Sequence, residues 1–208
     1  MTEPSQTCDS PTAARRKREI AEAARAELLE KGVEGLRMRA VADRAGINIA
    51  TLDYHVGGKE RLIELVAQSI ADDFKDQHLR NLRADATAIE RLVQELINFR
   101  EVRVRRPDIP VVMATLTRRA PTDAGIAKHI NPMRLRWHNL ICDTFALGAV
   151  DGTLRAGIDP PAAARVFKWA MLGMNDPDIL RLSYPEHAAE LLRAFAHDPT
   201  IDFERYFT

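Results

Sequence analysis

The sequence predicts an all-α protein. Runs of alternating β-branched residues bounded by turns, which are the signal of β-strands, are absent. Apolar residues instead recur at intervals of three and four over segments that Gly and Pro punctuate. The 208 residues are 46% hydrophobic and 29% charged, which is enough apolar material for a buried core. We therefore expect one large helical domain, or a small helical domain joined to a larger one.

The first third of the chain predicts four helices separated by glycines. Their expected ranges are about 13–31, 38–45, 49–55 and 59–78. The third is too short to be stable alone, because isolated helices need roughly 12–15 residues to be even marginal. Asn48 is a suitable N-cap for it. Such a helix has to be held in place by its neighbours.

Longer helices are expected over the rest of the chain. Their ranges are about 86–105, 111–119, 122–147, 160–174 and 185–197. Pro107 and Pro110 should separate the first two, and a break or kink is expected near Pro132. The pair Asp159-Pro160 is a start signal, because a capping Asp precedes a Pro in the first turn.

Two short helices with a turn at Gly46 between them form a helix-turn-helix pattern. The apolar side chains expected to pack inward are Val41, Ala45, Ile47, Leu52 and Val56. The residues left outward on the second helix are Asn48, Ile49, Ala50, Thr51, Asp53, Tyr54 and His55. A DNA major groove, about 12 Å wide, admits such a helix, and small residues near its start allow close approach to base edges.

Several neighbouring groups suit contacts to DNA phosphates. The hydroxyls of Thr51 and Tyr54 can donate, as can Lys59 and the helix N-terminus at Gly58. The basic cluster at residues 15–18, which includes Arg16, is expected to act as a flexible basic arm. Short helix-turn-helix shapes also occur in proteins that never touch DNA, and a basic cluster is commonly a solvated face. DNA binding is favoured on spacing, with that alternative left open.

The segment GLRMRAVADRAGINIATLDYHVGGKERLIEL, residues 35–65, resembles the DNA-binding domain of the TetR family of bacterial transcriptional repressors. The matching positions are Gly35, Val41-Ala42, Ala45-Gly46-Ile47, Thr51-Leu52, Tyr54-His55 and Lys59-Glu60 with Leu62. A second, weaker resemblance lies at VDGTLRAGIDPPAAARVFKWAMLGM, residues 150–174. Asp53, Val56 and the pair Leu36-Arg37 depart from the family pattern, although Arg37 can supply a phosphate contact through its charge.

The resemblance implies three parts of the chain: a flexible tail at 1–12, a helix-turn-helix domain at 13–58, and a helical effector-binding and dimerisation domain at 59–208. It implies a ligand-responsive regulator, expected to be a repressor that binds an inverted-repeat operator in double-stranded DNA as a homodimer and is released by a small-molecule effector. The alternative is a helical protein–protein adaptor with a helix-turn-helix fold that does not bind DNA. Asp53 is the best support for that alternative, because a carboxylate facing phosphate is repelled.

The resemblance also suggests where an effector and a partner subunit would bind. The predicted effector-binding residues are Phe99, Met113, Met133, Trp137, Ile141 and Trp169, since Met and aromatic side chains suit an adaptable apolar pocket. The predicted dimer interface consists of Val166, Ala170, Gly173, Leu191, Leu192 and Phe195. Residues of these types at helical spacing are also common in an ordinary core, so that alternative stays open.

No pattern in the sequence indicates an enzyme. The six histidines form no zinc spacing, and no nucleophile elbow, phosphate loop or dinucleotide fingerprint is present. We expect no cofactor and no metal. Cys8 and Cys142 lie far apart and outside any motif, which fits a reducing cytoplasm. No run of about 18 apolar residues suggests a membrane span, so no membrane partner is expected.

Overall fold

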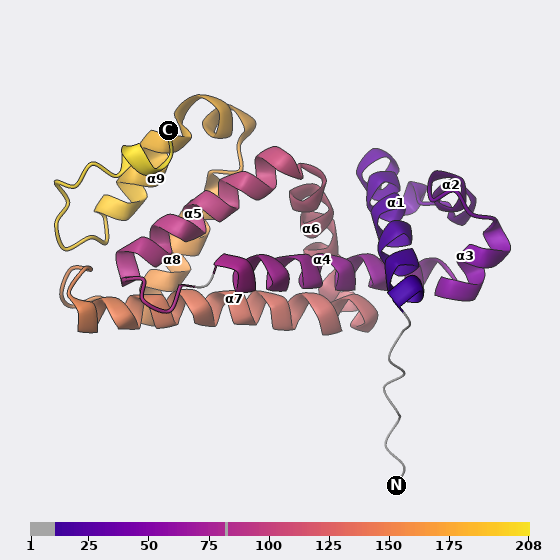
Figure 1. Ribbon diagram of the computed structural model, residues 1–208, viewed down its shortest axis with the longest axis horizontal. Helices are drawn as coiled ribbons and strands as arrows, with labels where there is room; N and C mark the ends of the chain where they lie inside the picture. Colours follow the sequence, from indigo (N-terminus) through magenta and orange to yellow (C-terminus); the bar gives the residue numbers. More distant parts are fainter. Residues whose placement is uncertain (1–10, 82) are drawn as a thin grey trace, which may run out of the picture. The chain divides into compact units, whose positions relative to one another are not determined.

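The computed structural model describes residues 11–81 and 83–208, and over these ranges the chain is helical. The prediction of an all-α fold is confirmed. The α-helices are α1 (Pro11–Gly35), α2 (Met38–Arg44), α3 (Ile49–Val56), α4 (Lys59–Asn81), α5 (Ala88–Arg105), α6 (Asp108–Arg119), α7 (Ala124–Asp151), α8 (Pro160–Gly173) and α9 (Tyr184–Arg193) (Figure 1). Short helical turns lie at Ala120–Thr122, Ile179–Ser183 and Glu204–Tyr206.

Three helix boundaries differ from the sequence prediction. Pro110 was expected to lie between two helices, but it lies in the first turn of α6, where its missing N–H costs no intrahelical hydrogen bond. Pro132 was expected to break or kink a helix, and α7 continues through it without a break. α1 begins at Pro11, before the predicted start, and its assigned range runs to Gly35; the helix is nevertheless interrupted at Gly32 (φ 65°), the residue at which the sequence predicted its end.

The chain divides into two compact units. Among the described residues, unit 1 consists of 11–75 and 108–131, and unit 2 consists of 76–81, 83–107 and 132–208. The sequence placed a domain boundary at residue 58, whereas this division falls inside α4 and again inside α7. Residues 1–10 of the predicted tail lie outside the described residues, and residues 11 and 12 belong to α1.

Unit 1 is organised around α1. Its fully buried side chains include Ile20, Leu36, Val41, Leu52, Leu62, Ile70 and Leu116. A buried cation also links its helices: Arg25 of α1 is 2% exposed, with Nη1 2.8 Å from Asp73 of α4 and Nε 3.8 Å from Asp108 of α6. Arg44 of α2 reaches back to α1, where its Nη2 lies 2.9 Å from Glu27. Apolar packing and the Arg44–Glu27 ion pair fix α2 on α1, while the Arg25 pairs connect α1 to α4 and α6.

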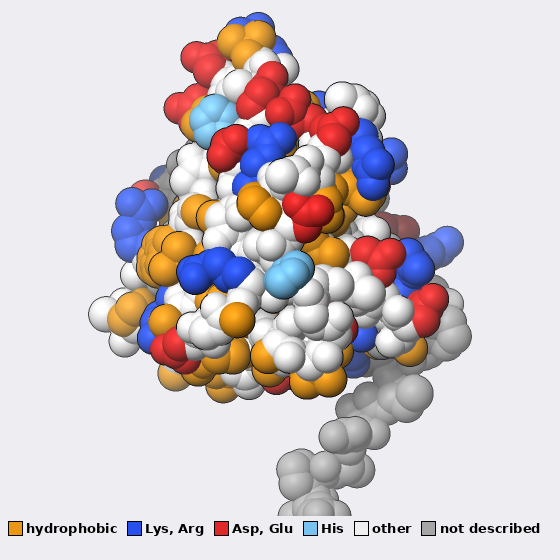
Figure 2. All heavy atoms as spheres, turned by 90° about the vertical axis from the view of Figure 1, so that its left-hand side faces the viewer, with side chains coloured by type: hydrophobic (Ala, Val, Ile, Leu, Met, Phe, Trp, Pro, Cys, Tyr) orange, Lys and Arg blue, Asp and Glu red, His pale blue; other side chains and the backbone are white. Residues whose placement is uncertain are grey.

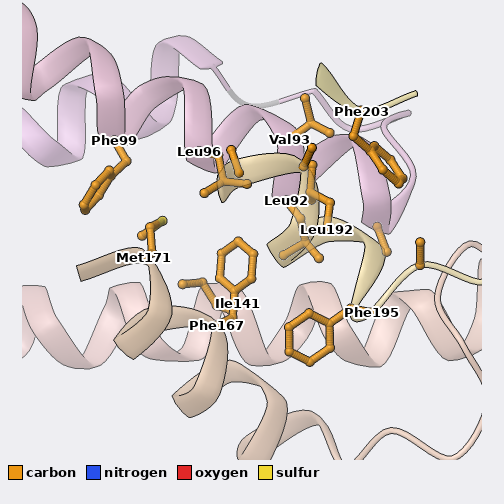
Figure 3. Close-up of a cluster of buried hydrophobic side chains, with 14 of the residues drawn as sticks. Leu92, Val93, Leu96, Phe99, Ile141, Phe167, Met171, Leu192, Phe195 and Phe203 are labelled. Atoms are coloured by element: carbon orange, nitrogen blue, oxygen red, sulfur yellow. The ribbon is translucent and has the colours of Figure 1, made fainter. Parts of the chain in front are cut away.

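Unit 2 has a separate apolar core, built from α5, α8, α9 and the later part of α7 (Figure 3). Three aromatic rings meet edge to face at its centre: Phe145 lies 4.9 Å from Phe195 and 6.0 Å from Phe167, measured between ring centroids. The hydroxyl of Tyr184, fully buried, donates to the carbonyl oxygen of Leu96 at 2.6 Å. On the face that Figure 2 shows, acidic and basic side chains are interspersed, as the equal counts of 30 basic and 30 acidic residues suggest.

Candidate functional site

The turn between α2 and α3 is closed by backbone hydrogen bonds. The N–H of Gly46 donates to the carbonyl of Asp43 at 3.2 Å, and the N–H of Ile47 donates to the carbonyl of Ala42 at 3.0 Å. Gly46 has a φ of 65°, in the left-handed region that favours glycine. The glycine that marked this turn in the sequence is therefore required by its backbone conformation.

Both ends of α3 are capped. The side-chain oxygen of Asn48 accepts a hydrogen bond from the N–H of Thr51 at 2.7 Å, as the predicted N-cap should. At the other end Gly57 has a φ of 70°, and its N–H donates to the carbonyl of Asp53 at 2.7 Å. These caps define a helix of eight residues, Ile49–Val56, whose propensity alone would not hold it together.

The inner face of α3 is buried. Leu52 is 0% exposed and Val56 is 7% exposed, and Val41 and Ala42 of α2 are buried with them. The predicted inward positions Ala45 and Ile47 are partly buried. Packing on α2, together with the caps, holds α3 in place.

The outer face of α3 carries the residues that the sequence assigned to DNA. Tyr54 is 87% exposed and Ile49 is 45% exposed, and Asn48 and Ala50 are exposed as well. Thr51, His55 and Lys59 are partly buried, and the ring of His55 lies 5.3 Å from that of Tyr54, edge to face. The outer face of α3 thus presents polar, small and aromatic side chains to solvent, and a major groove admits an α-helix.

Asp53 is exposed on the same helix, and in the described part of the chain it makes no ion pair. Arg37 is exposed beside α2, and its Nη1 donates to the carbonyl of Glu34 at 2.7 Å. The expectation of a flexible basic arm is corrected, because residues 15–18 are part of α1. Arg16 is held there by Glu19, at 2.7 Å, so a phosphate contact from Arg16 would come from a helix surface.

The helix-turn-helix segment matches a known family. The family model of the bacterial regulatory proteins of the tetR family matches residues 20–66, which contain α2, α3 and their supports. The HTH-type transcriptional regulatory protein RaaS of Mycobacterium tuberculosis is 28% identical over 180 residues, which are 84% of this chain and 76% of that protein. Residues 20–66 therefore form a helix-turn-helix domain of the TetR family of bacterial regulatory proteins.

Solved structures show the same fold along most of the chain. AibR, solved in complex with isovaleryl coenzyme A and operator DNA, matches with a TM-score of 0.71 at 22% identity, over 88% of this chain and 98% of that chain. KstR2, a ketosteroid transcriptional regulator of Mycobacterium tuberculosis, has a TM-score of 0.71 at 19% identity, over 88% of this chain and 96% of that chain. The prediction of a TetR-family DNA-binding regulator, which is not an enzyme, is confirmed at the level of the family.

Unit 2 contains a cavity of about 70 Å³. Its walls come from the end of α4, the segment before α5, α5 itself and α7; they consist of His78, Arg83, Ala86, Glu90, Arg91, Leu92, Gln94, Glu95, Asn98, Leu140, Ile141 and Thr144. Most of these side chains are polar, whereas the sequence predicted a pocket of Met and aromatic residues. The acidic and amide groups of α5 were not predicted.

The predicted effector residues do not gather at this cavity. Ile141 lines it, while Phe99 packs in the apolar core of unit 2. Trp137 touches a lining residue, since its Nε1 donates to the carboxylate of Glu95 at 2.7 Å. The expectation for Trp169 is corrected, because its side chain is 70% exposed on α8. Of the remaining two, Met133 is a partly buried residue of α7 in unit 2, and Met113 is a partly buried residue of α6 in unit 1.

The predicted dimer residues fall into two groups. Val166, Ala170 and Gly173 lie exposed on α8, with Val166 58% exposed. For α9 and the turn after it the expectation is corrected, because Leu192 of α9 is 0% exposed and Phe195 of the turn is 5% exposed within the core of their own unit. Leu191 is partly buried against the same core. The α8 face remains the part of the prediction that a partner subunit could reach.

Among the helices of the described chain, none combines the length and the apolar character needed to cross a bilayer. Over the same residues, no group of three or more His, Cys, Asp or Glu side chains is placed to hold a metal ion.

Proposed function

We propose that this TetR-family regulator is a repressor that binds an inverted-repeat operator as a homodimer and releases it when a small molecule binds in unit 2. The observation that carries the proposal is the construction of α3. Its inner face and both caps are satisfied within the chain, so its outer face is free to enter a groove. The operator-bound and ligand-bound AibR structure shows that a protein of this fold can hold both kinds of partner.

The exposed side of α8 supports the homodimer. Val166 and Trp169 are 58% and 70% exposed, and Ala170 and Gly173 lie exposed beside them. Large apolar side chains at such exposure commonly mark an interaction surface when they are contiguous. Small residues next to them permit close approach of a second helix. Sedimentation that shows only monomer at micromolar concentration would contradict this part of the proposal.

The release step is a population shift. A ligand in unit 2 weakens operator binding only if it prefers the conformation that does not fit the operator, and such coupling is typically ~1–3 kcal/mol, or about 5- to 150-fold in affinity. A ligand that raises the unfolding temperature and leaves operator affinity unchanged would argue against release.

The operator is tested by selecting bound duplexes from a random DNA library. Tyr54→Ala, on α3 where the side chain is 87% exposed, is run in parallel with Tyr206→Ala, an exposed tyrosine of unit 2, as the matched control. We expect an enriched inverted repeat with the unchanged chain and the control, and weakened enrichment with Tyr54→Ala.

The exposed carboxylate of Asp53 favours one other function, that of a helical adaptor that binds proteins and not DNA. Salt separates the two functions. Binding through several phosphates weakens steeply as salt rises, whereas an adaptor binds no duplex even at low salt.

A further inference from the structure

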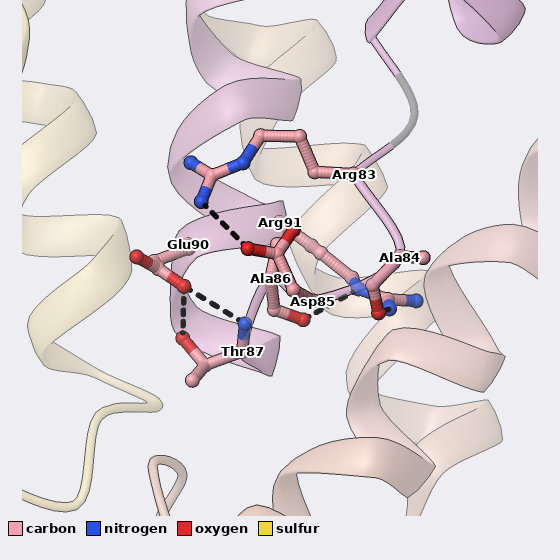
Figure 4. Close-up of polar contacts among 7 residues, drawn as sticks. All are labelled: Arg83, Ala84, Asp85, Ala86, Thr87, Glu90 and Arg91. Atoms are coloured by element: carbon pink, nitrogen blue, oxygen red, sulfur yellow. Dashed lines mark hydrogen bonds and ion pairs between the residues drawn. The ribbon is translucent and has the colours of Figure 1, made fainter.

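Most of the polar groups that line the cavity of unit 2 are already engaged in hydrogen bonds or ion pairs within the chain, and Figure 4 shows those around the start of α5. The guanidinium of Arg91 donates to the carbonyls of Ala86 and Ala84, at 3.0 and 3.3 Å. Arg83 lies 3.5 Å from Asp85, and the side chains of both are more than half exposed. Both arginines therefore contact the segment before α5, and solvent screens the charge of Arg83.

The other polar side chains of the cavity are also engaged. The carboxylate of Glu90 accepts from the N–H and the hydroxyl of Thr87, at 2.8 and 2.9 Å, in the capping box of α5. Gln94 donates to Asn98 at 2.9 Å, and the hydroxyl of Thr144 donates to its own helix. His78 and Glu95 are the remaining titratable side chains that line the cavity.

Glu95 differs from all of these. Its carboxylate accepts one hydrogen bond, from the neutral indole N–H of Trp137 at 2.7 Å. In the described part of the chain, no Lys, Arg or His side chain forms an ion pair with it. Burial raises the pKa of Glu95, which means that the surroundings disfavour its charge. A carboxylate in such a position gains from a cation that enters the cavity.

We propose that this cavity binds the ammonium head group of a small organic cation, with the Glu95 carboxylate as its counter-ion. A volume of about 70 Å³ suits a head group, since whole drug-sized ligands occupy pockets of roughly 300–1,000 Å³. The oxygen of Glu95 supplies the charge, and the side chains around it are held by their own hydrogen bonds. The inference rests on the proposed function, because it names the chemical class of the effector of unit 2.

The test uses three four-carbon probes that differ only in their head group: n-butylammonium, 1-butanol and butyrate. Their dissociation constants for the full chain are measured by NMR titration at neutral pH. A charge-assisted hydrogen bond to a carboxylate predicts that n-butylammonium binds about 10- to 100-fold more tightly than the other two. This comparison needs no variant, so a folding defect cannot obscure it. Equal binding of the three probes, or tighter binding of butyrate, would overturn the inference.

Two matched variants then locate the site. Glu95→Gln should remove the preference for n-butylammonium. Glu90→Gln makes the same change in the same cavity and keeps the capping box, which accepts Gln as well as Glu, so the preference should stay within about threefold. A preference that survives Glu95→Gln, or that both variants lose equally, would contradict the assignment.

Duplex selection keeps this inference apart from the proposed function. If an operator is enriched but n-butylammonium is not preferred, the proposal of a DNA-binding regulator stands and the proposed ligand class is refuted. If n-butylammonium is preferred in a way that depends on Glu95 but no duplex is enriched, the cation site stands and the proposed repressor function is refuted.

Discussion

Gly148 of α7 offers the sharpest test of packing in unit 2. Replacing Gly by Ala inside a helix normally stabilises it by about 1 kcal/mol. At this position an added Cβ would lie within 3.0 Å of three atoms of Leu154, including Leu154 Cβ at 2.8 Å. A rotamer change moves the outer atoms of a leucine and leaves its Cβ in place, so relief requires the backbone of Leu154 to move.

That backbone is firmly held. The N–H of Arg155 donates to the carbonyl of Phe195 at 2.9 Å, and the N–H of His197 donates to the carbonyl of Thr153 at 2.9 Å. The carboxylate of Asp151 accepts from both the N–H and the hydroxyl of Thr153. Overpacking against such a segment costs typically ~1–3 kcal/mol, which exceeds the gain in helix propensity. We therefore expect Gly148→Ala to destabilise unit 2 by about 1–2 kcal/mol.

Urea unfolding followed by circular dichroism and Trp fluorescence measures the change. Leu154→Ala alone should cost ~2–5 kcal/mol, because the side chain is 4% exposed. In the double variant the new methyl group occupies space that the leucine has left, so its loss of stability should fall short of the sum of the single losses by about 1 kcal/mol or more. The argument would be refuted if Gly148→Ala were as stable as the unchanged chain. It would also be refuted if the double variant lost as much stability as the two single variants together.

Three further predictions concern α3, Glu95 and Cys142. Asn48→Ala should lower the free energy of unfolding by ~1 kcal/mol, because the N–H of Thr51 loses its acceptor; Asn48→Asp should keep that stability in the same unfolding assay, and equal losses in both would contradict the cap. Burial raises the pKa of Glu95, so the folded chain binds more protons than the unfolded chain between the ordinary pKa and the raised one, and stability falls as pH rises through that window. Glu95→Gln should therefore be the more stable chain at pH 7, with a difference that shrinks towards pH 4; a constant difference in thermal unfolding would refute this. Burial also raises the pKa of the Cys142 thiol, so in a Cys8→Ser background its reaction with iodoacetamide at pH 7 should be slower than that of free cysteine, and a faster reaction would contradict it.

The helix-turn-helix was predictable because its requirements are local. Gly46 and Gly57 have positive φ angles, and Asn48 caps α3 from within the motif. Leu52 and Val56, four residues apart, form the buried face of α3. Each of these depends on neighbours close in sequence. The boundary between the two units was not predictable in the same way, because it depends on which distant helices pack together inside continuous α4 and α7.

The apolar stripes of α8 and α9 show where sequence reasoning stops. α8 is apolar on two sides, and the structure buries Phe167 and Met171 while it leaves Val166 and Trp169 exposed. An interface and a core use the same residue types, so spacing alone could not assign Leu192 of α9 to the core.

One signal of the cavity was present in the sequence. Glu95 lies three residues after Leu92 and four before Phe99, within the buried stripe of α5. A charged residue in such a stripe is a candidate for a site, because it is costly to bury.

The two faces of α3 divide stability from recognition. Leu52 and Val56 hold the helix from inside, and the exposed Tyr54, Ile49 and Ala50 contribute little to that packing. Substitutions on the outer face can therefore change which DNA sequence is bound at little cost in folding. Asn48 is the exception, since its oxygen is engaged in capping and only its amide N–H groups are left to donate. If Asn48 touches DNA, it therefore contacts an acceptor, either a phosphate oxygen or the acceptor edge of a base, and a change of specificity at this position has to preserve the cap.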